Sequence, residues 1–228
     1  MKQAAYQALV AERKACTLCK ELELTNPASA ALCHLDSNQI GPWTRWQGDL
    51  DADIMVVAQD WGDVESFKRQ SGKDNESPTN RMLIKLLDHV GVRVTSPLAS
   101  RQDSGVFLTN AVLCLKHGNA QTAVSKQWYA NCGPKFLRRQ IEIVRPRVVV
   151  TLGEWAYKTT MHSFELEPRR FRDAVNSVDA VELFQGTCLV PVYHCGPKIL
   201  NTRVRDREAQ FKDWMRVRHA LTGNIPDA

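Results

Sequence analysis

The chain has 228 residues, of which 43% are hydrophobic and 24% charged, and its formal net charge is +5. This size and apolar content support one hydrophobic core, so we expect a single domain over residues 1–228. No apolar run approaches the about 18 residues of a membrane span, and no apolar signal region opens the chain, which predicts a cytoplasmic protein with no membrane partner. The mild basic excess is compatible with a polyanionic partner but is also common on ordinary surfaces.

The first predicted helix covers residues 2–14, where Tyr6, Leu9 and Val10 share one helical face. Residues 20–50 are rich in Gly, Pro and Trp and are expected to be irregular. Residues 54–58 are apolar without alternation, which is typical of a short strand buried on both faces of a parallel sheet.

The remaining predicted elements alternate between strands and helices. Strands are predicted at residues 105–114, 147–153 and 189–194, and helices at residues 82–90, 134–146, 154–161 and 205–220. This alternation predicts an α/β fold with three layers, α/β/α, around a central, mostly parallel, four-stranded sheet.

Polar residues mark the ends of three predicted strands, namely Asp60, Asn110 and His194. In open α/β sheets, ligands collect beyond the carboxyl ends of the strands. Asp60 alone, beside a Trp and a Gly, is most simply a solvated loop residue. Three side chains of such different chemistry instead predict one shared cleft.

Seven cysteines without a secretory signal favour metal, redox or core roles over a disulfide framework. Cys16 and Cys19 form a Cys-x2-Cys pair, and Cys114 and Cys132 lie in the middle of the chain. The two pairs could meet around one zinc or iron-sulfur centre. The spacing fits equally well with a coincidental pair and two small core residues.

Several runs of sequence carry a family resemblance. They are the Cys16/Cys19 pair, residues 48–57 (GDLDADIMVV), residues 108–114 (LTNAVLC), Cys132, residues 144–153 (VRPRVVVTLG) and residues 190–194 (VPVYH). In this order and spacing, the chain resembles the uracil-DNA glycosylase superfamily, and most of all its iron-sulfur members of families 4 and 5.

Two motifs depart from the family 4 pattern. Residues 58–63 (AQDWGD) are closer to the Gly-Gln-Asp-Pro-Tyr-His of family 1 than to the Gly-Glu-Ala-Pro-Gly of family 4, which favours an acid at Asp60. His194 is followed by Cys195, Gly196 and Pro197 where the family has His-Pro-Ser. The chain also lacks the Lys-Arg-Arg-Ile-His loop of the covalently trapping uracil-DNA binders, so covalent capture is not expected.

The resemblance implies catalytic roles for two residues. His194 would donate a hydrogen bond to uracil O2 as negative charge develops there. Asp60 would orient the attacking water and stabilise the cationic sugar. From the residues alone, a satisfied core histidine would be the better interpretation of His194.

The resemblance also implies binding residues. Gln59, Trp61 and Asn110 would contact the base, with Asn110 accepting from the N3 proton and donating to O4. Lys198, Leu200 and Arg203 would wedge the duplex and hold phosphate. The residues themselves leave open a core position for Trp61 and a solvated helix entry for residues 198–203.

The resemblance thus implies a monofunctional DNA N-glycosylase that flips deoxyuridine out of single- or double-stranded DNA and hydrolyses its N-glycosidic bond in base-excision repair. A structural [4Fe-4S] cluster would be held by Cys16, Cys19, Cys114 and Cys132, and we expect a monomer. Two alternatives stay open: a catalytically weak protein that binds uracil-containing DNA, and a zinc-stabilised, non-catalytic α/β scaffold.

Overall fold

The computed structural model describes residues 1–42, 49–71, 77–94, 105–118, 122, 124–202 and 205–223. In this part of the chain a central sheet has five strands in the order β3-β2-β5-β7-β6. The strands are β2 (Ile54–Ala58), β3 (Val106–Asn110), β5 (Val148–Leu152), β6 (Val181–Phe184) and β7 (Thr187–Val192). All neighbouring pairs are parallel except β6 and β7, which confirms the α/β class and the mostly parallel sheet.

The prediction of four strands was wrong, because β6 adds a fifth at the sheet edge. This strand pairs antiparallel with β7, and its register shifts between Glu182 and Phe184. Only Leu183 of its four residues is buried. A half-exposed edge strand lacks the continuous apolar run that identified the buried strands, so the sequence did not reveal it.

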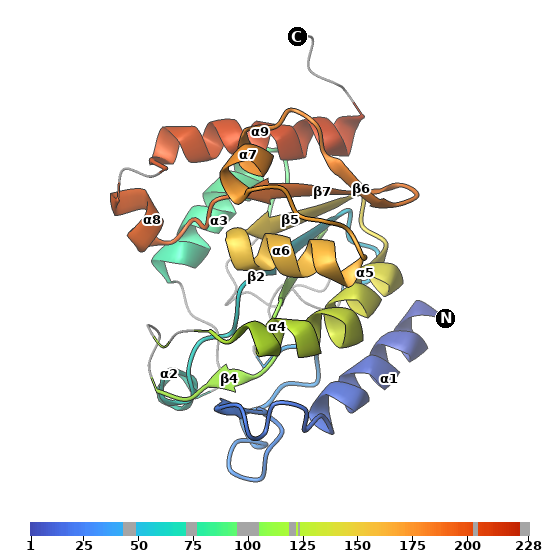
Figure 1. The fold of residues 1–228 in the computed structure, drawn as a ribbon, viewed down its shortest axis with the longest axis vertical. Coiled ribbons are helices and arrows are strands. Elements are labelled where there is room, and N and C mark those ends of the chain that lie inside the picture. Colours follow the sequence, from blue (N-terminus) through green and yellow to red (C-terminus); the bar gives the residue numbers. More distant parts are fainter. Residues whose placement is uncertain are drawn as a thin grey trace.

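Helices cover both faces of the sheet (Figure 1). The helices of the described part of the chain are α1 (Lys2–Lys14), α2 (Val64–Arg69), α3 (Pro78–His89), α4 (Lys126–Cys132), α5 (Arg138–Val144), α6 (Glu154–Ser163), α7 (Phe171–Asn176), α8 (Pro197–Asn201) and α9 (Arg207–Thr222), of which α2 lies beside β4 and away from the central sheet. Among the described residues, none of these helices combines the length and the apolar character needed to cross a membrane.

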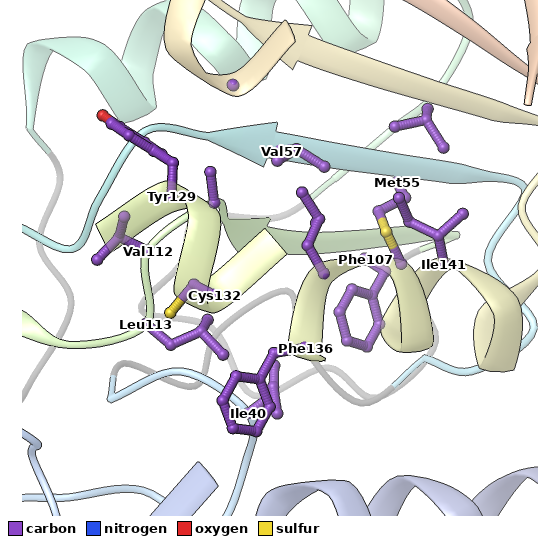
Figure 2. Close-up of a cluster of buried hydrophobic side chains, with 14 of the residues drawn as sticks. Ile40, Met55, Val57, Phe107, Val112, Leu113, Tyr129, Cys132, Phe136 and Ile141 are labelled. Atoms are coloured by element: carbon purple, nitrogen blue, oxygen red, sulfur yellow. The ribbon is translucent and has the colours of Figure 1, made fainter. Parts of the chain in front are cut away.

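The sheet separates two hydrophobic clusters, because successive residues of a strand point to opposite faces. Met55 and Val57 of β2 belong to the cluster beneath α1, α4, α5 and α6, part of which is drawn in Figure 2. Ile54 and Val56 belong to the cluster beneath α3 and α9. The predicted three-layer α/β/α arrangement is therefore present, and both faces of β2 are buried as its unbroken apolar run indicated.

The prediction that Pro134 opens a helix was wrong. The helix begins at Lys126, where the Ser125 hydroxyl caps it by accepting a hydrogen bond from the Gln127 N–H at 3.2 Å. Pro134 lies inside a π-helical turn, η1 (Gly133–Leu137), which joins α4 to α5. Such a turn tolerates the missing proline N–H within an otherwise continuous helix. The predicted end holds, since Arg145 adopts a left-handed conformation just before Pro146.

The second predicted strand was too long. β3 ends at Asn110, and the chain then continues along β2 through two backbone contacts, from Ala111 N–H to the Ala58 carbonyl at 2.8 Å and from Val112 N–H to the Gln59 carbonyl at 3.1 Å. A short strand, β4 (Leu115–Lys116), follows and pairs antiparallel with β1 (Leu24–Thr25). This small ribbon joins the N-terminal segment to the segment that carries Asn110.

Candidate active site

The carboxyl ends of the parallel strands bring the three predicted polar residues to one edge of the sheet. Asn110 is the last residue of β3 and pairs in register with Ala58, the last residue of β2. Asp60 follows β2 by two positions, and His194 follows β7 by two positions. β5 lies between β2 and β7, and the two side chains are close enough for the charge of Asp60 to raise the pKa of His194 against the larger effect of burial.

The carboxylate of Asp60 is fixed by three donors. The Gln59 side-chain Nε2 donates to Oδ2 at 2.7 Å, and the Gly62 N–H donates to Oδ1 at 2.9 Å. The ammonium of Lys116 lies 3.3 Å from Oδ2, and the Asp60 side chain is only 8% exposed. Asp60 is therefore an oriented, nearly buried anion and not the solvated loop residue of the simpler reading.

His194 is held in one tautomer. The Gly196 N–H donates to its Nδ1 at 3.0 Å, so the proton of the neutral ring is on Nε2. Burial lowers the pKa of His194, and the nearby Asp60 charge opposes this only in part. The Gln210 amide donates to the His194 carbonyl at 3.1 Å and fixes the backbone. The ring is thus a neutral imidazole with one N–H available as a donor.

The side chain of Asn110 presents an unused acceptor. The residue is 3% exposed, and its Oδ1 atom has no hydrogen-bond partner within the described part of the chain. Leaving a buried amide oxygen without a donor costs about 1–3 kcal/mol. Such an atom at the end of β3, on the sheet edge that also carries Asp60 and His194, indicates a site shaped for a ligand that carries an N–H or O–H group.

The other predicted contact residues differ in their surroundings. Trp61 is 5% exposed and packs with Leu32, Phe67 and Leu115 in a third hydrophobic cluster. On α8, Lys198 is exposed, whereas Leu200 is half-buried against the α3/α9 cluster. Arg203 lies outside the described residues.

Sequence reasoning missed two residues of this site. Lys116 contacts Asp60 as described above, and its position depends on a two-residue strand that has no periodicity to detect. Tyr129 on α4 is buried, and both burial and the charge of Asp60 raise the pKa of its hydroxyl. Figure 2 shows Tyr129 at the end of the hydrophobic cluster, beside the tip of β2. A buried aromatic residue in an amphipathic helix gave no signal of this proximity.

The four predicted metal ligands line one cavity of about 420 Å³. Its walls also carry the basic side chains of Arg13, Lys14, Lys20 and His117. Burial raises the pKa of the Cys132 thiol to about 12, with smaller contributions from a backbone hydrogen bond at Leu113, which lowers it, and from the nearby Cys19 and Cys16, which raise it. Burial also raises the pKa of Cys114, and Cys132, Cys19 and Cys16 add to this effect, so all four thiols are close enough to interact.

The four thiols are spread around the wall of this cavity. In the described ranges, no three His, Cys, Asp or Glu side chains are arranged to hold one metal ion. Zinc requires four ligands within about 2.3 Å of one point, whereas an iron-sulfur cluster needs cysteines spread around a larger body. The roomy cavity, the four thiols and the basic walls fit a cluster that carries net negative charge with its thiolates.

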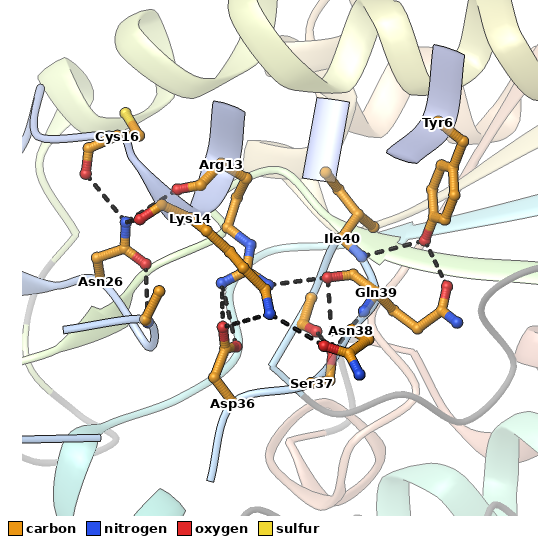
Figure 3. A network of polar contacts seen from close by, with 12 residues as sticks. Tyr6, Arg13, Lys14, Cys16, Asn26, Asp36, Ser37, Asn38, Gln39 and Ile40 are labelled. Carbon is orange, nitrogen blue, oxygen red and sulfur yellow. Dashed lines mark hydrogen bonds and ion pairs between the residues drawn. The ribbon is translucent and has the colours of Figure 1, made fainter. Parts of the chain in front are cut away.

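Polar contacts fix the N-terminal wall of this cavity (Figure 3). The Asn26 amide lies within 3.2 Å of the carbonyl oxygens of Arg13, Lys14 and Cys16, so it holds the end of α1 and the start of the Cys-x2-Cys loop together. The Arg13 guanidinium is buried and pairs with Asp36 at 2.9 Å. On the opposite wall, the Asn131 amide donates to the Cys19 sulfur at 3.3 Å.

Comparison with known proteins places this geometry in context. Residues 46–217 match the family model of the uracil DNA glycosylase superfamily. A type-4 uracil-DNA glycosylase from Archaeoglobus fulgidus is 26% identical over 167 residues, which cover 72% of this chain and 76% of that protein. A type-5 uracil-DNA glycosylase from Pyrobaculum aerophilum is 29% identical over 170 residues, 72% of this chain and 68% of that protein. A type-4 uracil-DNA glycosylase from Thermotoga maritima is 28% identical over 148 residues, which cover 65% of this chain and 67% of that protein.

Proposed function

Because the chain belongs to the uracil DNA glycosylase superfamily, we propose that it is a monofunctional uracil-DNA glycosylase that releases free uracil from DNA by hydrolysis. The observation that carries this proposal is the buried, unpartnered Oδ1 of Asn110 next to an oriented carboxylate and a neutral imidazole. Uracil presents an N3–H donor between two carbonyl oxygens, which is the pattern that the Asn110 amide and the His194 N–H complement, while the Asp60 carboxylate is available to a water molecule. The whole chain would act as one domain and as a monomer.

Base recognition follows from the Asn110 amide. Its Oδ1 accepts from uracil N3–H, and its amide nitrogen donates to O4. Cytosine carries an acceptor at N3 and an amino group at C4, so both contacts would be repulsive. A deoxyuridine in a duplex must leave the stack to reach a buried amide, which costs a few kcal/mol. Leu200 on α8 would support this step by filling the space that the flipped nucleotide leaves in the duplex, and Lys198 would bind phosphate.

Bond cleavage separates charge, and each charge has a partner already in place. As the N-glycosidic bond breaks, electrons move to uracil O2, where the His194 Nε2–H would donate a hydrogen bond. A neutral donor suits this task, because the ring need not lose a proton during the step. The sugar becomes cationic at C1′, and Asp60 would orient water toward it and accept the water proton. Gln59 would help to hold this carboxylate.

The cysteine cavity would hold a [4Fe-4S] cluster through Cys16, Cys19, Cys114 and Cys132. The cluster supplies a cross-link between two distant segments when it is bound. The chain's own contribution would be the basic side chains of Lys14 and Lys20 on the cavity wall and the hydrogen bond from Asn131 to the Cys19 sulfur. The fold thereby ties the loop after Asn110 to the N-terminal helix.

The test compares the parent protein with Asp60→Asn on an oligonucleotide that contains one labelled deoxyuridine. We expect the parent to release uracil and the variant to be slower by about 100-fold or more, with affinity for the same oligonucleotide nearly unchanged. Glu65→Gln, on the exposed surface of α2, is the matched control. Binding by the parent without release would favour a uracil-DNA-binding protein, and neither binding nor release would favour a non-catalytic scaffold.

A further inference from the structure

A buried lysine pairs with the carboxylate at the end of β2. The Nζ atom of Lys116 lies 3.3 Å from Oδ2 of Asp60, and the side chains of the two residues are 4% and 8% exposed. Lysine is among the residues least often buried, and it is buried almost only when paired. The burial of Lys116 at this position therefore requires an explanation in terms of the acid it contacts.

The backbone around Lys116 is held from two sides. In the β1–β4 ribbon, Lys116 pairs in register with Leu24. On the other side, the Lys116 N–H donates to the Gly62 carbonyl at 3.0 Å, and a bridge links Lys116 to Asp63. The same loop that carries Asp60 thus receives both the backbone and the ammonium group of Lys116. These backbone contacts fix the Cα atom of Lys116 beside the loop, and the burial of its side chain limits how far the ammonium can move from the carboxylate.

The donors around Asp60 are unevenly distributed. Oδ2 faces both the Gln59 amide and the Lys116 ammonium, whereas Oδ1 accepts only the Gly62 N–H among the described contacts. A carboxylate oxygen can accept about two hydrogen bonds, so the open acceptor position is on Oδ1. Lys116 and Gln59 together therefore occupy Oδ2 and leave the free acceptor position on Oδ1.

We propose that Lys116 is a positioning residue for the reaction: its ammonium fixes the Asp60 carboxylate so that Oδ1 receives the attacking water. This role rests on the proposed glycosylase function. Lys116 does not touch substrate and acts only through Asp60. A nearly buried carboxylate without its counter-charge is strongly destabilised, so removal of the ammonium would let Asp60 reorient. A displacement of about 1 Å at a catalytic group can reduce the rate about 100-fold.

The experiment is a double-mutant cycle on the intact protein. Lys116→Met removes the charge and keeps the length, and Asp60→Asn removes the partner charge. Single-turnover uracil release with enzyme in excess reports the chemical step, while fluorescence anisotropy with the same oligonucleotide reports binding. We expect Lys116→Met to slow release by about 100-fold with binding changed less than about 3-fold. In the Asp60→Asn background, the same lysine substitution should change the rate by less than about 2-fold.

Two further variants separate positioning from folding. Lys116→Arg keeps the charge and should retain a rate within about 10-fold of the parent, and Lys68→Met removes an exposed lysine of α2 and should leave the rate unchanged. If Lys116→Met alone does not fold, the double variant, which buries no unpaired charge, still gives the comparison with Asp60→Asn. A parent-like rate for Lys116→Met would overturn the inference, as would equal slowing in both backgrounds. If the parent itself releases no uracil, the proposed function fails, and this role fails with it.

Discussion

Loss of the His194 ring should slow uracil release without weakening DNA binding. The structure leaves this residue one donor, Nε2–H, because Nδ1 already accepts from the Gly196 N–H at 3.0 Å. His194→Ala therefore removes one hydrogen bond to the developing anion. Loss of a single oxyanion donor typically reduces the rate about 100- to 1,000-fold, or about 2.7–4 kcal/mol. Single-turnover release from a uracil-containing oligonucleotide measures this change directly.

A second substitution tests the geometry without removing the ring. A Cβ at Gly196 would lie 2.8 Å from both Nδ1 and Cε1 of His194 and 3.1 Å from the Thr79 hydroxyl, so Gly196→Ala must displace the imidazole. We expect this variant to lose most of the rate that His194→Ala loses. His34→Ala, at an exposed position, is the control.

The pH profile follows from the same residue. Burial holds the pKa of His194 below its ordinary value of about 6.5, so the neutral ring persists as the pH falls through 6.5. The rate of release should stay level through this range and decline only at lower pH, when the ring gains a proton and loses the Gly196 contact. The folded state should lose stability as the pH falls from about 6.5 toward the lowered pKa, since His194 takes up its proton first in the unfolded chain.

A rate of uracil release by His194→Ala within about 3-fold of the parent would refute the role of His194 as the donor to the leaving uracil.

Three further predictions concern recognition, the cysteine cavity and the buried ion pair. Asn110→Asp should reduce discrimination between uracil and cytosine, because an ionised carboxylate offers only acceptors; competition between the two oligonucleotides measures this. Protein purified without air should be brown and contain iron, and Cys132→Ser should lower its iron content and its absorbance in the visible blue, whereas a colourless, zinc-loaded parent would contradict the cluster assignment. Asp36→Ala leaves the Arg13 guanidinium buried without its carboxylate and should lower stability by about 3–5 kcal/mol in thermal unfolding, whereas Glu12→Ala at the exposed pair should have a much smaller effect.

The sequence predicted the elements whose signals are local. Residues 54–58 and 147–153 are continuous apolar runs, and both are buried central strands. Because polar residues follow such strands directly, the convergence of Asp60, Asn110 and His194 could also be predicted, although their roles remain predictions.

The missed features depend on contacts between distant segments. Lys116 contacts Asp60 because β4 pairs with β1, and a two-residue strand carries no periodicity of its own. Pro134 was misplaced because a proline ordinarily starts a helix, whereas here a π turn accommodates it within one. A Trp at position 61 is compatible with a base contact or with a core position. Only the packing with Phe67 shows that it belongs to a hydrophobic cluster.

The attachment of the N-terminal segment to the middle of the chain imposes an order of assembly during synthesis. Trp128 donates to the Leu22 carbonyl at 2.7 Å, and Lys2 donates to the Val144 carbonyl at 3.0 Å. A ribosome adds roughly 5–20 residues per second, so Cys19 emerges on the order of 10 s before Cys132. During that interval α1 can contact the segment around Asp36 but lacks the surface of α5, and the first two thiols wait for their partners from the middle of the chain. Delivery of the proposed cluster would therefore have to wait until α4 and α5 have left the ribosome, so its insertion would be a late event in maturation.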